Sequence, residues 1–178
     1  MTILGQHPEI GAALRVTQLI VLLLFLGVVL FLGVATFFVV SGRVEPVDKP
    51  LLAYVLLATG VMAITVVAIL RSVILRQTRA AALRRDPSAD PSRDPGQLEE
   101  RGITGLLFRG WQTSTIMMAA AIEGAALMSA VAAIVEGQAW SIVAGGMFAS
   151  LLLLYVPTTS RLEHHLEGEM TEIESARG

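Results

Sequence analysis

The chain has 178 residues, of which 54% are hydrophobic and only 16% are charged, and its mean hydropathy is +0.68. A soluble domain of this size would carry about 25% charged residues, so the composition favours a helical membrane protein over a soluble globular one. The net charge of −2 gives no support to nucleic-acid binding, and the lack of cysteine excludes disulfides, thiol catalysis and thiolate metal sites.

Four apolar stretches are long enough to cross a bilayer as helices, at about residues 16–42, 50–70, 110–135 and 138–158. About 20 residues at a rise of 1.5 Å each cover a hydrocarbon core of about 30 Å. An outer-membrane barrel is excluded, because its strands would alternate polar and apolar residues. The predicted fold is therefore an all-α polytopic membrane protein, with four transmembrane helices arranged as two antiparallel hairpins in residues 1–75 and 110–160.

The segment between the hairpins, residues 76–109, is predicted to be a cytoplasmic linker rich in arginine and proline. Residues 71–85 should continue the second span as a basic helix, and the three Asp-Pro steps in residues 86–95 should end it. Residues 97–109 are expected to form a short interfacial helix, with Trp111 at the level of the lipid headgroups. Residues 161–178 form an acidic cytoplasmic tail that is expected to begin as a helix.

The distribution of basic residues predicts the orientation. Eight arginines lie in residues 71–109, whereas the loop between the first two spans holds only Arg43 and Lys49, and residues 136–138 hold neither lysine nor arginine. The positive-inside rule then places the arginine-rich loop in the cytoplasm, and with four spans both termini lie there too.

Glu123 is the only charged residue within the spans. A carboxylate at mid-membrane depth costs roughly 2.5–3.5 kcal/mol or more, so Glu123 is a candidate site for ion or proton binding. Three states are open: a neutral acid that hydrogen-bonds a neighbouring helix, reversible binding of H⁺ or Na⁺, or contact with water or with a cation of a partner protein. Hydroxyl groups that could assist the second state belong to Ser129, Thr59, Thr65 and Thr115.

Small residues surround Glu123 and recur in the fourth span, and such residues let membrane helices approach closely. We expect the third span to lie at the centre of the bundle and to cross the fourth span at short distance, whereas the first span should face lipid. The residues predicted to pack the helices are Gly124, Ala120, Ala125, Gly145, Gly146 and Ala149.

Residues 119–133 (AAAIEGAALMSAVAA) resemble the carboxylate-bearing helix of the rotary ATPase ring proteolipids, or c-type subunits. That resemblance implies that Glu123 is the ion-carrying group of an oligomeric ring, although those proteins carry the carboxylate on the second helix of a hairpin and here it is on the first. Residues 122–127 (IEGAAL) and the overall layout are also similar to uncharacterised four-span bacterial membrane proteins. This second resemblance implies a multi-pass protein of the bacterial inner (plasma) membrane and brings no assigned activity.

The leading functional prediction is a small integral membrane protein that is a subunit of a homo-oligomer or larger membrane complex, with Glu123 as its buried polar centre. Two alternatives remain: a proton- or cation-coupled channel or transporter component that uses Glu123, and a membrane anchor that recruits cytoplasmic partners. No phosphate loop, nucleophile motif or metal-ligand motif is present, so we expect no enzyme, no cofactor and no metal site. His165 and Glu169 would share a helix face in the tail, but two ligands without an enclosed site indicate a solvated segment.

Overall fold

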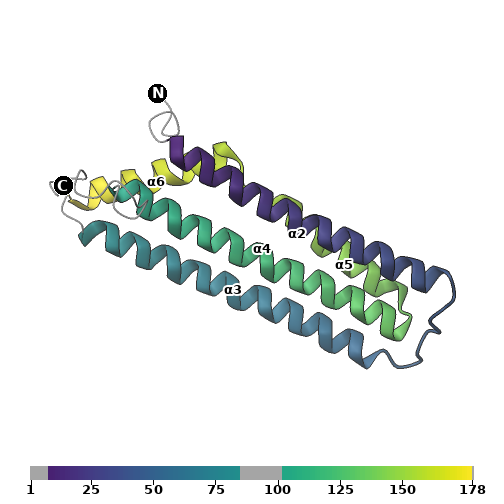
Figure 1. Cartoon of the computed structure of the whole chain (residues 1–178). Coiled ribbons are helices and arrows are strands. Elements are labelled where there is room, and N and C mark those ends of the chain that lie inside the picture. The colour runs from purple at the N-terminus through teal and green to yellow at the C-terminus, as the bar shows by residue number, and fades with distance from the viewer. Residues whose placement is uncertain (1–7, 85–101, 178) are drawn as a thin grey trace. The chain divides into compact units, whose positions relative to one another are not determined.

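The computed structural model describes residues 8–84 and 102–177, which form five α-helices and no strand (Figure 1). The all-helical prediction is confirmed for these residues. Prolines mark the boundaries, as expected for a residue that suits the first turn of a helix and disrupts its interior: Pro8 opens the first helix, Pro50 precedes the second, and Pro157 separates the last two. The helices are α2 (Pro8–Val40), α3 (Leu51–Arg84), α4 (Gly102–Glu136), α5 (Ala139–Leu154) and α6 (Thr159–Arg177).

Two compact units divide the chain, and α2, α3 and α4 each contribute to both. The apolar unit comprises Leu19–Ile69 and Ile116–Val156, and the arginine-rich unit comprises Met1–Gln18, Leu70–Thr115 and Pro157–Gly178. The helical segments of the apolar unit are roughly 24 to 33 Å long at 1.5 Å per residue, close to the thickness of a hydrocarbon core. The Asp-Pro steps of the predicted linker lie outside the described residues.

Three helices are long and apolar enough to cross a membrane: α2, α3 and α4. The predicted fourth span corresponds to α5, which has only 16 residues, and it counts as a fourth candidate only if the bent pair of α5 and α6 is one broken span. The chain is therefore a helical membrane protein with three to four candidate spans, and the arrangement as two hairpins stays a prediction.

In the apolar unit, α4 packs against each of the other three helices. Half of the most apolar window of α4 is buried, compared with 17% for α2 and 11% for α3. Val28 of α2, Ala126 of α4 and Ala149 of α5 form one of its buried clusters, and Gly60 of α3 abuts Ala125 of α4. The expectation of a central third span is confirmed within this unit. Large apolar side chains of α2 are exposed, and their contact with lipid stays a prediction.

The turn between α4 and α5 is tight, as the sequence predicts. Gly137 has a φ of 66°, a left-handed conformation that glycine adopts without steric cost. Its N–H donates to the carbonyl of Ala133 at 2.9 Å, which closes the end of α4. Glycine is required here for a second reason, because an added Cβ would lie 2.9 Å from the backbone carbonyl of Glu45.

The arginine-rich unit has a core of its own, built from α2, α3, α4 and α6. The buried side chains that share it are Ile10, Leu14, Ala82, Leu107, Phe108, Trp111, Leu162, Leu166 and Ile173. Two polar contacts join its segments: Gln112 Nε2 donates to Thr17 Oγ1 at 2.9 Å, and Gln18 Nε2 donates to the carbonyl of Pro157 at 2.8 Å.

Two expectations for this region need correction. Trp111 is only 6% exposed and packs against Phe108 inside the unit, so its side chain is covered by the chain itself and does not face lipid headgroups. The segment expected as a separate interfacial helix is, from Gly102 onward, the first part of the continuous helix α4. Both differences have one cause: α6 folds over this end of α4 and supplies the apolar partners that lipid would otherwise provide. The basic extension of α3 as far as Arg84 and the helical tail are confirmed.

Candidate functional site

Glu123 is half-buried on α4, beside the face that the apolar unit leaves exposed. Positions i, i+3, i+4 and i+7 of a helix share one face, and here they are Ala120, which is exposed, and Glu123, Gly124 and Leu127, which are half-buried. Ala119, Ile122 and Ala126, on the side of α4 away from Ala120, are at most 2% exposed. The carboxyl group therefore lies between the exposed part of α4, at Ala120, and Gly27 of α2.

The residue of α2 beside the Glu123 carboxyl group is a glycine. A Cβ built on Gly27 would lie 3.9 Å from Glu123 Oε1, so the lack of a side chain on Gly27 leaves room beside the carboxyl group. Glu123 makes no hydrogen bond or ion pair with any residue in the described ranges 8–84 and 102–177.

The four hydroxyl groups proposed as its partners are not brought to it. Each donates to a carbonyl of its own helix: Thr59 to Val55, Thr65 to Val61, Thr115 to Trp111 and Ser129 to Ala125. Thr115 belongs to the arginine-rich unit, and Ser129 is buried six residues along α4 from Glu123, on a different face. The described chain therefore surrounds Glu123 with none of the oxygen ligands considered from the sequence.

The six small residues predicted to pack helices fall into two groups. Gly145 lies where an added Cβ would be 2.6 Å from Leu32 Cδ2 and 3.4 Å from the carbonyl of Ala126, and Ala125 and Ala149 are buried. These residues pack the bundle, and the close crossing of the third and fourth predicted spans is confirmed. Ala120 is exposed, and an added Cβ on Gly124 or Gly146 would meet nothing within 4 Å.

A second carboxylate, which the sequence analysis did not single out, stabilises the helix ends. Glu136 at the end of α4 accepts hydrogen bonds from the first turn of α3, with Leu52 N–H donating to Oε1 at 2.7 Å and Ala53 N–H donating to Oε2 at 2.8 Å. These backbone donors have no partner within their own helix, and a negative charge suits a helix N-terminus. The two contacts join residues 84 and 83 positions apart, so no local signal reveals them.

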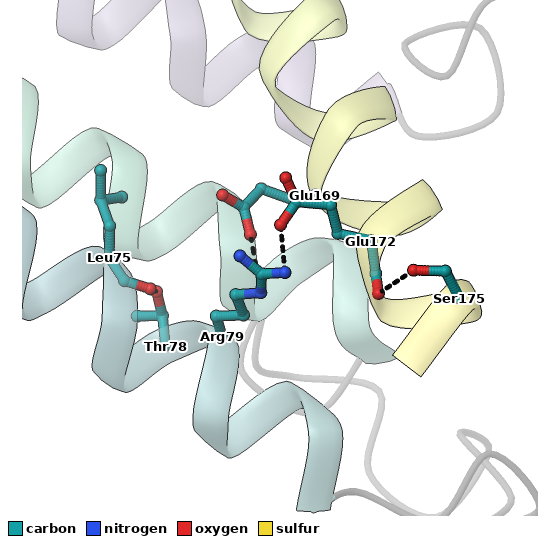
Figure 2. A network of polar contacts seen from close by, with 6 residues as sticks. All are labelled: Leu75, Thr78, Arg79, Glu169, Glu172 and Ser175. Atoms are coloured by element: carbon teal, nitrogen blue, oxygen red, sulfur yellow. Dashed lines mark hydrogen bonds and ion pairs between the residues drawn. The ribbon is translucent and has the colours of Figure 1, made fainter. Parts of the chain in front are cut away.

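A third polar cluster lies in the arginine-rich unit. Figure 2 shows Arg79 of α3 between Glu169 and Glu172 of α6, with Arg79 Nε 3.9 Å from Glu169 Oε2 and Arg79 Nη2 paired with Glu172. The basic extension of α3 and the acidic tail, which the sequence predicts as separate segments, therefore neutralise each other in part.

His165 of α6 is half-buried beside this cluster. Burial lowers the pKa of His165 below the ordinary histidine value, the charge of Glu169 opposes that effect, and the charge of Arg71 adds to it. The side chain is therefore held mainly as neutral imidazole near neutral pH.

No cluster of three or more histidine, aspartate or glutamate side chains that could hold a metal ion is found within residues 8–84 and 102–177. Glu169, the partner considered for His165, is instead engaged with Arg79. Comparison of the chain with protein-family models, curated proteins and solved structures finds no match. The two resemblances noted from the sequence therefore stay predictions, and any function rests on the geometry of the chain.

Proposed function

We propose that the protein is a subunit of a membrane homo-oligomer in which a second copy covers the face of α4 that carries Glu123, with the arginine-rich unit on the cytoplasmic side. The observation that carries the proposal is the position of Glu123: a carboxyl group in a membrane span, on an incompletely covered face, without a partner among the described residues. Lipid tails offer no hydrogen bond to such a group, so it is stable only when a neighbour supplies one.

The residues around Glu123 suit the approach of another helix. Ala120 and Gly124 are four positions apart on the same open face, which is the small-xxx-small spacing by which membrane helices pack closely. The other small residues of α4, such as Ala125 and Ala126, are already buried within the chain. Ala120 and Gly124 therefore remain available for a contact between chains.

A second copy is favoured over a different partner because the carboxyl group is self-complementary. A protonated carboxyl group carries one donor and one acceptor, so two Glu123 side chains related by a two-fold axis satisfy each other. Symmetric contacts of this kind use the same patch on both subunits, and two-fold dimers are the commonest oligomers. No positive charge is needed from the partner.

The absence of cysteine from the chain permits a direct test by disulfide cross-linking of single-cysteine variants in vesicles. Ala120→Cys should give a cross-linked dimer on oxidation, because a disulfide forms only when the two Cα atoms approach within about 7 Å. Met62→Cys on α3 is the matched control, since Met62 is 63% exposed and also lies in the apolar unit. The proposal fails if Ala120→Cys does not cross-link, or if Met62→Cys cross-links equally well.

Two substitutions of Glu123 separate this function from ion handling. Glu123→Gln keeps a donor and an acceptor and should preserve association measured by energy transfer between labelled copies, whereas Glu123→Leu should weaken it by about 0.6–2 kcal/mol. If Glu123 instead carries protons or Na⁺, carbodiimide labelling of the wild type should fall as pH rises or as Na⁺ is added. If labelling falls in this way and Glu123→Leu associates as well as the wild type, the results favour a function as a channel or transporter component.

A further inference from the structure

Arginines near the apolar unit occur on each of the three long helices. On α2, Arg15 lies four positions before Leu19, the first residue of the apolar unit. On α4, Arg109 lies seven positions before Ile116, and on α3, Arg76 lies seven positions after Ile69, where the apolar unit begins and ends respectively. At 1.5 Å per residue these offsets are about 6 to 10 Å along each helix. The headgroup region adds about 5–8 Å on each side of the hydrocarbon core, so a long arginine side chain at these positions reaches it.

All three arginines are exposed. Arg79 lies farther along α3 and is paired with Glu169 and Glu172, so α6 neutralises it. Arg15 and Arg76 make no hydrogen bond or ion pair with another described residue. The acidic tail therefore pairs with Arg79 and leaves Arg15 and Arg76 exposed, whereas Arg71, two positions beyond Ile69, is half-buried.

The exposed face of the α3 extension also carries apolar side chains. Val73 and Arg76 are three positions apart on one face of the helix, and Val73 is 41% exposed. An apolar group and a guanidinium side by side suit the boundary between acyl chains and headgroups, where the long side chain extends its charge toward the phosphates.

We propose that Arg15, Arg76 and Arg109 form an arginine belt that binds the headgroups of anionic phospholipids. A guanidinium group matches a phosphate with two parallel hydrogen bonds, which a lysine cannot reproduce. The partner is a lipid surface because the belt lies on helices whose continuations are long and apolar enough to cross the membrane, so phospholipid headgroups are adjacent to it. Charge complementarity then selects anionic over zwitterionic headgroups.

The test measures lipid selectivity of the full-length protein in vesicles of mixed phosphatidylglycerol and phosphatidylcholine. Electron paramagnetic resonance of a spin-labelled form of each lipid gives the relative affinity of the protein surface for the two. The wild type should prefer phosphatidylglycerol by about fivefold, which corresponds to one arginine near an anionic headgroup. The triple variant Arg15→Gln, Arg76→Gln, Arg109→Gln should show a ratio near one, and the triple lysine variant should retain part of the preference.

The control variant is Arg43→Gln with Asp48→Asn, in the loop between α2 and α3. Both residues are exposed, and replacing one cation and one anion leaves the net charge of this loop unchanged, so the preference should not change. If the triple glutamine variant does not fold, the lipid preference of the wild type is measured at increasing salt concentration instead. Screening by salt should remove an electrostatic preference. The proposal is overturned if the wild type shows no preference, if the triple glutamine variant retains the full preference, or if salt has no effect.

Discussion

Gly60 and Ala125 mark the closest approach of α3 and α4. A Cβ on Gly60 would lie 2.9 Å from the Cβ and 3.1 Å from the Cα of Ala125, and a backbone atom at that distance cannot move aside without shifting the helix. Gly60→Ala should therefore lower the free energy of unfolding by about 1–3 kcal/mol. The measurement is a denaturant titration in detergent.

The control for Gly60 is Gly146→Ala on α5, where an added Cβ meets nothing within 4 Å. Alanine favours a helix over glycine by up to about 1 kcal/mol, so this variant should be as stable as the wild type or more stable. If Gly60→Ala and Gly146→Ala destabilise the protein equally, α3 and α4 do not cross closely at Gly60.

Glu136 contributes stability through the two hydrogen bonds that it accepts from backbone N–H groups. Glu136→Ala leaves the N–H groups of Leu52 and Ala53 without their acceptor in a buried position, and loss of such a cap costs about 0.5–2 kcal/mol. Thermal unfolding should show the loss. Glu45→Ala, at an exposed position in the adjacent loop, should have little effect, and an equal effect of both variants would contradict the capping role.

At the scale of the element, α6 combines an apolar face with an acidic one. Leu162, Leu166 and Ile173 are at most 2% exposed within the arginine-rich unit, and Glu172, beside this apolar face, reaches Arg79. Exposed ion pairs contribute little, with a median of about 0–1 kcal/mol, so the apolar face supplies most of the stability of this contact. The ion pairs with Arg79 join α6 to α3.

The docking of α6 should depend on pH through His165. Because burial lowers the pKa of His165 in the docked state, the undocked helix binds the proton more readily, and docking weakens as pH falls below about 6.5. Trp111 lies in the same core as Leu162 and Leu166, so its fluorescence in a Trp140→Phe background should shift to longer wavelength on acidification.

His165→Gln should remove the part of this pH dependence that lies near neutrality. His164→Gln is the matched control, because His164 is exposed and should leave the profile unchanged. Glu169 and Arg71 must stay intact in both variants, since their charges act on His165 in opposite directions. An identical profile for wild type and His165→Gln would assign the pH response to other groups.

At the scale of the whole molecule, charge and apolar surface are separated between the two units. The described arginines other than Arg43 belong to the arginine-rich unit, whereas the apolar unit exposes large hydrophobic side chains such as Leu30, Met62 and Val143. This separation is what a bilayer requires, with apolar surface facing lipid and cations on one side of it.

The orientation can be tested with single-cysteine variants and a membrane-impermeant thiol reagent, because the chain has no cysteine of its own. Lys49→Cys and Gln77→Cys, both at exposed positions, should react from opposite sides of the membrane, with Gln77→Cys on the cytoplasmic side. Ser175→Cys in α6 should react from the same side as Gln77→Cys. Reaction of Lys49→Cys and Gln77→Cys from one side would contradict an odd number of crossings between them.

Local patterns account for the part of the fold that was predicted correctly. Runs of apolar residues without proline are sufficient to place α2, α3 and α4, and small residues correctly identified the crossing at Gly145. The candidate site was predicted less completely. Glu123 stands out by its charge in an apolar run, but the hydroxyls of Thr59 and Ser129 proved to be bonded to their own helices, since a nearby carbonyl is always available to them.

The sequence by itself determined that this protein is helical, apolar and asymmetric in charge, because hydropathy and charge are properties of each segment alone. Only the tertiary structure decided that Glu123 is half-buried beside Gly27 of α2, that Glu136 caps a helix 84 residues away, and that Trp111 is buried by α6. These features depend on which segments meet. Many pairings of the same apolar helices bury similar area, so side-chain shape and distant polar contacts select among them.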